Sequence, residues 1–481
     1  MTAASQARLR ATEPASWRDA AQAWRSWAAA AGRWAADLRA HAARISAVWT
    51  GSAADAVTTH LGGLIRRLNL FRLGCWAADQ ALSEFAAELA RARAMPTGSA
   101  HAGAPGGVVT GQSAQGAPAA LRLAAEADAA TARRLAAIGY EERSAVDSLP
   151  CTATPAEVRR WWRALSPEQQ RGLLASEPGR IGALDGIPAS DRDLANRLAL
   201  DALPPDTPGL GALVDRLADD GGPRAYLMEL DPAGEGRAAV ALGDPDRAAH
   251  VLTQVPGMTA DLASYGGELA RAERIAVRAA ELAPETSTST IMWLGYDAPD
   301  FLDEAATRSR ADAGAAGLRR FQDGLRATHL GAPAQQTVLG HSYGSLVVGS
   351  AAARPGLAAD DVVFVGSPGV GVDSAADLHV PPGRVWSTTS RTDIVQWAAV
   401  SPRSLAEDLV LSQALPGGAV VAFARPENDL YFGTNPSDPA FGARVFASRP
   451  DAGHLGYWDT GSESLDALAA IATGRGDVIP R

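Results

Sequence analysis

The pattern of apolar positions changes twice along the chain. In residues 14–95 it has a helical period, which predicts two long helices separated by a break at Trp49-Thr50-Gly51. The first helix carries four tryptophans at spacings of seven, three and seven residues, as expected for one helical face: Trp17, Trp24, Trp27 and Trp34. Two antiparallel helices joined by a tight turn form a hairpin. We expect the tryptophan face to pack in a core. The alternative is a face that docks a partner helix.

The middle of the chain has a different composition. Residues 96–118 are rich in glycine, alanine and serine, which is typical of a flexible linker. The pattern then predicts an amphipathic helix over 119–146 and several short helices over 155–217. We therefore expect four regions, listed here in chain order: a hairpin over 1–95, a linker over 96–118, a helical bridging region over 119–220, and a separate domain over 221–481.

From Arg224 onward, strand-like runs alternate with helical ones. Ala225–Leu230 and Arg237–Leu242 flank a turn signal and predict a leading β-hairpin. Further strands follow, separated mainly by helices over 260–282 and 302–329, and they are predicted at residues 250–255, 288–294, 337–339, 362–365, 385–388 and 443–447. This alternation predicts an α/β fold with a mostly parallel sheet and helices on both faces.

The strand at 337–339 runs into Gly340-His341-Ser342-Tyr343-Gly344, and an apolar helical run follows. A serine between two glycines at a strand–turn–helix junction is the signature of a nucleophile elbow. The glycines lack Cβ atoms, so strand and helix can approach closely while the turn lifts the serine hydroxyl above the sheet. The pattern predicts the α/β-hydrolase fold, with Ser342 as its nucleophile.

In that fold an acid and a histidine follow the nucleophile in chain order. Asp393 lies in the loop after the second strand beyond the elbow, and His454 lies in the loop after the last strand. His454 would accept the proton of Ser342, while Asp393 would orient the imidazole. Asp373, after the preceding strand, is the alternative acid. His341 is expected to orient the turn or to pack.

An oxyanion hole needs two donors beside the nucleophile. One is expected to be the backbone N–H of Tyr343, directly after Ser342. The other should come from the loop after the third strand, Val255-Pro256-Gly257-Met258. Proline has no N–H, so the second donor is predicted to be Gly257 or Met258.

Net charge and composition limit which classes of partner and which cellular location we expect. The 481 residues carry a net charge of −10, which offers no basic stripe for nucleic acid. No apolar run reaches the ~18 residues of a membrane-spanning helix. The N-terminus lacks the apolar core of a signal peptide, so we expect a cytoplasmic protein, with export by a route without a cleaved signal as the alternative.

The sequence also bears on cofactors. It contains no His-x-x-x-His motif and no paired cysteines, and no Gly-x-Gly-x-x-Gly opens a helix after a strand. We therefore expect neither a metal nor a nucleotide cofactor. Cys75 and Cys151 are expected to be separate buried thiols, and a disulfide between them is the alternative.

Segments over about residues 220–475 resemble the actinobacterial α/β-hydrolase family DUF1023. They include the oxyanion loop, the elbow and the histidine, together with Trp293-Leu294-Gly295-Tyr296-Asp297-Ala298-Pro299, Val365-Gly366-Ser367-Pro368-Gly369, Phe432-Gly433-Thr434-Asn435-Pro436, Asp438-Pro439-Ala440-Phe441-Gly442 and Tyr457-Trp458. The resemblance implies a serine hydrolase with Ser342, Asp393 and His454 in the roles argued above. The run His454-Leu455-Gly456-Tyr457 departs from the His-Ser-Asp-Tyr expected for the family.

Trp49-Thr50-Gly51 resembles the turn of the WXG100 family of helical hairpins, which dimerise and are linked to type VII secretion. The family's export tag, a tyrosine followed four residues later by an acid, has no counterpart near the end of the second helix.

Together these features predict a serine hydrolase that cleaves a small-molecule or lipid carboxylic ester. The competing hypothesis is a secretion-linked interaction or effector protein. Its hairpin would bind a protein partner, and its hydrolase domain would be inert or active on an envelope lipid. The apolar segment 396–435 is predicted to form a cap over the site, and the alternative is packing against the N-terminal helices.

Overall fold

The computed structural model describes residues 9, 11–95, 113–138, 152–204, 207–219, 221–300, 302–305, 307–395 and 430–479. The chain divides into two compact units. Unit 1 comprises residues 1–149, 161–182 and 193–204, and unit 2 comprises residues 150–160, 183–192 and 205–481. The predicted linker over 96–118 lies largely outside the described residues, as do Cys151 and most of the predicted cap. Cys75 is a buried free thiol.

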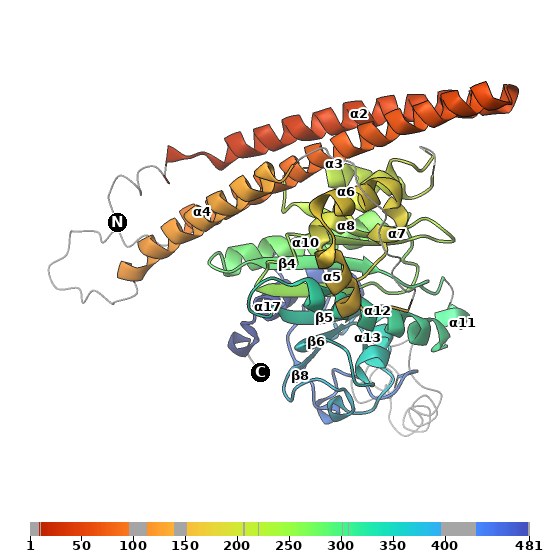
Figure 1. Ribbon diagram of the computed structural model, residues 1–481. Coiled ribbons are helices and arrows are strands. Elements are labelled where there is room, and N and C mark those ends of the chain that lie inside the picture. Colours follow the sequence, from red (N-terminus) through yellow and green to blue (C-terminus); the bar gives the residue numbers. More distant parts are fainter. Residues whose placement is uncertain are drawn as a thin grey trace, which may run out of the picture. The chain divides into compact units, whose positions relative to one another are not determined.

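Unit 1 contains the predicted helical hairpin. Helices α2 (Pro14–Val48) and α3 (Ser52–Ala94) run along each other, and α4 (Ser113–Ala136) packs on α3 (Figure 1). Gly51, at the break between the two long helices, has φ +106°, a conformation that glycine adopts without a steric penalty. The helix predicted over 119–146 is shifted towards the N-terminus: it begins at Ser113 and ends at Ala136.

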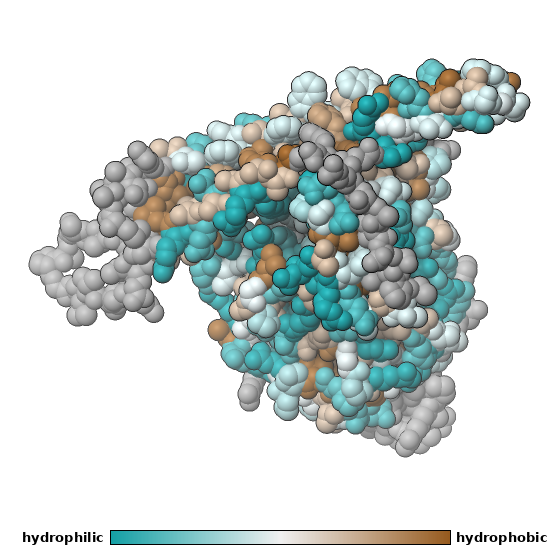
Figure 2. Space-filling view, viewed as in Figure 1, coloured by the Kyte–Doolittle hydropathy of each residue, from teal (hydrophilic) through white to brown (hydrophobic). Residues whose placement is uncertain are grey.

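The predicted packing of the tryptophan face is wrong for three of its four members. On α2 the residues that are buried between the helices are small: Pro14, Ala21, Ala28, Ala31 and Ala35. Trp17 is half-buried and meets the Phe85 ring edge-on at 5.0 Å, but Trp24, Trp27 and Trp34 are 40%, 58% and 56% exposed. Alanine allows the two helix backbones to approach closely, and this displaces the bulky neighbours to the rim. In Figure 2 hydrophilic and hydrophobic residues alternate along this helix.

Short helices connect α4 to the sheet, and several begin at sequence signals. Ser166 caps the second of them: its Oγ accepts the Gln169 N–H, and the Gln169 side chain accepts the Ser166 N–H, which together form a capping box. The helices are α5 (Pro155–Ala164), α6 (Pro167–Ser176), α7 (Pro178–Gly182), α8 (Ala189–Leu200) and α9 (Leu210–Ala218).

Unit 2 is built on a sheet whose eight described strands have the order β1-β2-β4-β3-β5-β6-β7-β8. The β1–β2 and β2–β4 pairs are antiparallel, and all later pairs are parallel. The strands are β1 (Ala225–Asp231), β2 (Arg237–Leu242), β3 (His250–Val255), β4 (Thr288–Leu294), β5 (Gln335–His341), β6 (Asp361–Val365), β7 (Val385–Thr388) and β8 (Arg444–Val445). The last strand is shorter than its predicted span of 443–447, because it pairs only with Trp386 and Ser387.

Helices cover both faces of this sheet (Figure 1). Leu252 of β3 packs in one apolar cluster with residues of α10 (Tyr265–Leu282) and α17 (Glu463–Ala472). The next residue, Thr253, accepts a hydrogen bond from Gln322 of α12 (Ser309–Thr328), which packs on α13 (Gly344–Ala352). Successive residues of a strand face opposite sides, so the two helix pairs lie on opposite faces. The predicted α/β architecture is confirmed.

Shorter helices complete unit 2. Helix α11 (Leu302–Ala305) precedes α12, and single 3₁₀ turns occur at η1 (Ala375–Asp377), η2 (Pro439–Phe441), η3 (Gly456–Trp458) and η4 (Gly476–Val478). Among the described residues, no helix combines the length and hydrophobicity needed to cross a bilayer.

Candidate active site

Ser342 occupies a strained turn between β5 and α13. Its φ is +54°, a left-handed conformation that a residue with a side chain adopts at an energetic cost. Its backbone N–H donates to the Val365 carbonyl at 3.0 Å, so the end of β6 holds the turn. The side chain is half-buried, and within the described part of the chain its hydroxyl has no hydrogen-bond partner. The serine is therefore held by its backbone while its hydroxyl stays available.

The two elbow glycines sit where strand, turn and loop backbones touch. A Cβ atom on Gly340 would lie 2.6 Å from the Cα of Ser345, at the start of the helix. A Cβ atom on Gly344 would lie 2.4 Å from the Val255 carbonyl oxygen. Either contact is far inside van der Waals distance, so both positions require glycine for the close approach that the sequence predicted.

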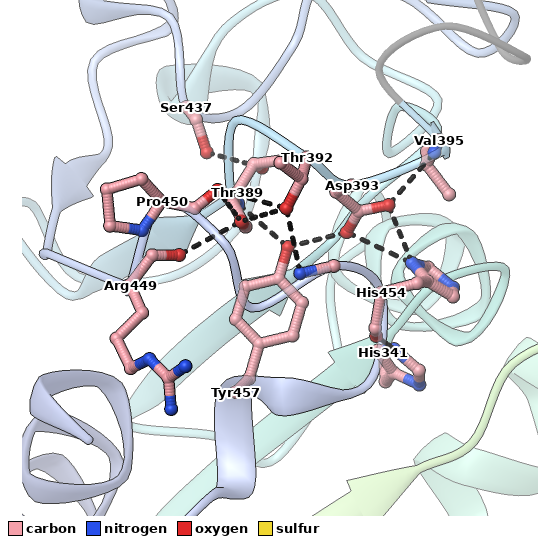
Figure 3. A network of polar contacts seen from close by, with 12 residues as sticks. His341, Thr389, Thr392, Asp393, Val395, Ser437, Arg449, Pro450, His454 and Tyr457 are labelled. Carbon is pink, nitrogen blue, oxygen red and sulfur yellow. Dashed lines mark hydrogen bonds and ion pairs between the residues drawn. The ribbon is translucent and has the colours of Figure 1, made fainter.

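Asp393 and His454 meet in the loops after β7 and β8 (Figure 3). The His454 Nδ1 lies 2.8 Å from Asp393 Oδ1 and 3.0 Å from Oδ2. Asp393 is fully buried, and its Oδ1 also accepts the Val395 N–H at 2.9 Å. Because a carboxylate accepts, the histidine proton lies on Nδ1, and Nε2 is left with a free lone pair.

Asp373, the alternative acid, has a different contact. Its Oδ1 accepts the Thr434 backbone N–H at 3.1 Å, and it lies close to Gly433. Its hydrogen-bond partner is therefore the chain after Leu430, and the carboxylate that reaches His454 is Asp393.

Gly366, directly after β6, brings the acid–histidine pair next to the strand that holds the serine. A Cβ atom here would lie 2.6 Å from Asp393 Oδ2 and 3.2 Å from His454 Nδ1. The residue before it, Val365, accepts the Ser342 N–H. The predicted nucleophile, acid and base are therefore carried by loops at one edge of the sheet, as the chain order implied.

His341 links the elbow to the histidine loop. Its Nε2 donates to the His454 carbonyl at 3.0 Å, and the two imidazole rings lie 4.6 Å apart. Burial, together with the neighbouring His454, holds the pKa of His341 well below its usual value, so the ring is neutral. The Trp458 ring contacts His341 edge-on at 4.9 Å. This residue both packs and supports the turn, as its place beside the serine suggested.

The predicted oxyanion loop lies against the nucleophile. A Cβ atom on Gly257 would lie 2.5 Å from Ser342 Cβ. Among the described residues, no group accepts a hydrogen bond from the backbone N–H of Gly257, Met258 or Tyr343. Gly257 and Tyr343 are buried, and their N–H groups lie beside Ser342 without an acceptor among the described residues. The Tyr296 hydroxyl anchors this loop by donating to the Pro256 carbonyl at 2.6 Å.

Tyr457 is a site residue whose contact the sequence did not indicate. Its hydroxyl donates to Asp393 Oδ2 at 2.5 Å and accepts the Ser390 N–H at 2.8 Å (Figure 3). Burial and the nearby Asp393 raise the pKa of this phenol. Its position three residues after the histidine is the only sequence signal, and that spacing does not show which acid it would reach.

Hydroxyl groups join the acid loop to the histidine loop. The Thr392 Oγ1 donates to the Pro450 carbonyl at 2.9 Å and accepts the Gly453 N–H at 3.0 Å, one residue before His454. The Ser390 Oγ lies 3.0 Å from the Pro450 carbonyl oxygen as well. In Figure 3 this network lies to the left of the Asp393–His454 pair. The two loops are therefore held together at several points besides the Asp393–His454 hydrogen bond.

At the end of the predicted cap, a short piece is described. Phe432 meets the Tyr343 ring edge-on at 6.1 Å, and its N–H donates to the Pro368 carbonyl at 3.2 Å. Residues 396–429 of the predicted cap lie outside the described residues. Within the described residues, no group of three or more histidine, cysteine, aspartate or glutamate side chains is arranged to hold a metal ion.

Comparison with known proteins agrees with this architecture. Residues 231–402 match a family model described as an alpha/beta hydrolase. The uncharacterized protein Rv2079 of Mycobacterium tuberculosis is 34% identical over 385 residues, which cover 69% of this chain and 57% of the relative. The uncharacterized proteins Rv0963c of M. tuberculosis and Mb0988c of Mycobacterium bovis are each 38% identical over 187 residues, 37% of this chain and 69% of the relative.

The chain belongs to the same family as these mycobacterial proteins. Its unit 2 carries an alpha/beta hydrolase domain. The match to Rv2079 covers 57% of that protein, so the chain spans little more than half of its length.

Proposed function

We propose that the protein is a serine hydrolase that cleaves a carboxylic ester of a small molecule or a lipid. The observation that carries the proposal is the Asp393–His454 pair at the sheet edge that also holds the strained Ser342. The finer resemblances to DUF1023-type hydrolases and to WXG100 hairpins stay predictions.

In the proposed reaction, His454 Nε2 accepts the Ser342 proton while the serine oxygen attacks the ester carbonyl carbon. The carbonyl oxygen becomes an oxyanion, for which the N–H groups of Tyr343 and of Gly257 or Met258 are the proposed donors. Each such donor contributes about 3 kcal/mol to transition-state stabilisation. Asp393 keeps the Nδ1 proton in place and stabilises the imidazolium.

Collapse of the tetrahedral intermediate breaks the bond to the alkoxy group, which leaves as an alcohol with the proton from His454. The acyl group stays on Ser342. A water molecule then gives a proton to His454 and attacks the acyl carbon. The second collapse releases the carboxylic acid and returns the proton to Ser342, which restores the enzyme.

A fluorophosphonate probe tests this proposal, because it labels serines that a base activates. We expect the wild-type protein to be labelled, and Ser342→Ala to lose both the label and about 10⁶-fold in kcat. Ser350→Ala is the matched control: this serine lies near the C-terminal end of α13, and its buried hydroxyl has no partner among the described residues. An unlabelled wild type, or labelling of Ser342→Ala, would contradict the proposal.

A second proposal concerns unit 1. The exposed tryptophans Trp24, Trp27 and Trp34 favour a hairpin that binds a helical protein partner, and this role is compatible with hydrolysis by unit 2. Replacement of these tryptophans by serine separates this role from a purely structural one.

A further inference from the structure

We propose that Tyr457 is a positioning residue for the hydrolase: its hydroxyl orients the Asp393 carboxylate and thereby sets the basicity of His454. The inference rests on the proposed serine hydrolase function. It adds to the predicted triad a fourth residue that touches neither the nucleophile nor the substrate.

Among the described residues, three groups donate hydrogen bonds to the Asp393 carboxylate. The Val395 N–H reaches Oδ1 at 2.9 Å, and the Tyr457 hydroxyl reaches Oδ2 at 2.5 Å. The His454 Nδ1 lies between the two oxygens, at 2.8 and 3.0 Å. With one donor on each oxygen from elsewhere, the carboxylate plane cannot rotate away from the imidazole without losing a hydrogen bond.

The direction of the Tyr457 hydrogen bond follows from its second contact. The Ser390 backbone N–H can only donate, and it lies 2.8 Å from the Tyr457 oxygen. The phenol proton is therefore directed at Asp393. Burial and the Asp393 charge both raise the pKa of the phenol, so it stays protonated at neutral pH. Tyr457 is thus a permanent donor to this acid.

Tyr457 also sits on the loop that carries the base. It lies in η3, three residues after His454, and is fully buried. The Ser464 hydroxyl at the start of α17 donates to its carbonyl at 2.8 Å. The same short segment therefore carries the imidazole and also hydrogen-bonds its acid partner. This fixes the position of Asp393 relative to His454.

The charged and titratable groups that the described residues place around His454 are few. Asp393 faces it from the loop after β7, and His341 faces it from β5. Tyr457 follows on its own loop, and Arg271 of α10 lies over the Trp458 ring at 5.5 Å. His341 is neutral, so Asp393 is the nearest charge. A donor that shares the Asp393 charge weakens its pull on the imidazolium.

Removal of the hydroxyl in Tyr457→Phe should leave more of the Asp393 charge to the imidazole and so favour the imidazolium. We expect the acid limb of the kcat/KM profile to move up by about 0.5–1 pH unit, with kcat at the plateau reduced about tenfold. KM should change little, because the phenol does not reach the substrate. The matched control is Tyr265→Phe, which removes a buried hydroxyl that donates to the Met292 carbonyl at 2.9 Å. Its profile should equal that of the wild type.

A second variant tests the same idea without loss of the hydrogen bond. With 3-fluorotyrosine at position 457 the phenol is a stronger donor, so the acid limb should move to lower pH. The low-field proton resonance of the His454 Nδ1–H should shift in both variants, and this readout needs no turnover.

An unchanged acid limb and an unchanged resonance in a folded Tyr457→Phe protein would overturn the proposal. If that variant does not fold, an unchanged limb in the fluorotyrosine protein would overturn it. If the proposed hydrolase function is wrong, the result is distinguishable from a wrong role for Tyr457, because the wild type would then neither react with a fluorophosphonate nor hydrolyse esters.

Discussion

The hairpin of unit 1 and the active-site edge of unit 2 both depend on very small residues, but small size serves different ends in the two regions. On α2, Ala21, Ala28, Ala31 and Ala35 are at most 1% exposed and allow α2 and α3 to lie close together. Gly32 faces the buried Arg72 guanidinium, which is 3.1 Å from where its Cβ would be. In the hairpin, small size brings two whole helices together.

At the sheet edge, glycines bring single reactive groups together. Gly257 lies against the Cβ of Ser342, and Gly366 lies against Asp393 and His454. A methyl group at either position would displace a side chain that takes part in the proposed chemistry. The comparison teaches that a change in the hairpin should alter stability and leave catalysis unchanged, whereas a change at the sheet edge should alter catalysis directly.

Among variants that keep the serine, the largest expected effect is that of Asp393→Asn. The amide cannot hold the imidazole in the required tautomer, so kcat should fall on the order of 10⁴-fold. Steady-state ester hydrolysis measures this, and thermal unfolding checks that the fold is retained. Asp373→Asn is the matched control, since its partner is the Thr434 backbone, and it should keep most of the activity. If Asp373→Asn instead causes the large loss, the acid follows β6.

Gly257→Ala sharpens the comparison at the oxyanion loop. The new Cβ would lie 2.5 Å from Ser342 Cβ and 3.0 Å from its Oγ, so the loop or the serine must move. Displacement of one oxyanion donor should lower kcat by about 10²–10³-fold. Gly267→Ala on α10 is the control, because a Cβ there meets no atom within 4 Å. Equal kcat values for the two variants would mean that this loop does not supply a donor.

The smallest effects on catalysis are expected in the hairpin. Ala28→Leu adds bulk between α2 and α3 and should destabilise unit 1 by about 1–3 kcal/mol in chemical unfolding. Replacement of Trp24, Trp27 and Trp34 by serine should change stability by only about 0.5 kcal/mol per site, because these side chains are largely exposed. Neither variant should change kcat.

Severe destabilisation by the triple tryptophan variant would mean that these side chains pack within the chain, and it would contradict the docking proposal for the hairpin. Loss of ester hydrolysis in the same variant, with the fold intact, would show that the hairpin supports catalysis directly.

Periodicity and turn signals were enough to predict most helices and strands, although not all of their ends, because hydrogen bonds within a helix and alternation along a strand are local properties. The leading β-hairpin, the mostly parallel sheet and the two helical layers are confirmed. The order of Ser342, Asp393 and His454 along the chain was also visible, since parallel strands bring their carboxyl ends to one edge. Their roles stay predictions.

Burial in the hairpin could not be predicted from the same pattern. Tryptophan and alanine recur at similar helical spacing on α2, and hydrophobicity favours the tryptophans for the interior. Only the packed pair of helices decides between them, because a two-helix interface has a fixed width and close contact of the backbones excludes large side chains from its centre.

The chain by itself determined which segments become helices and strands and which loops carry the candidate chemistry. The tertiary structure alone decided which carboxylate meets His454, that Tyr457 holds that carboxylate, and that alanines rather than tryptophans fill the hairpin interface. The reason is physical: the first set depends on neighbours within a few residues, whereas the second depends on distances of a few ångströms between residues 61 and 64 positions apart or on different helices.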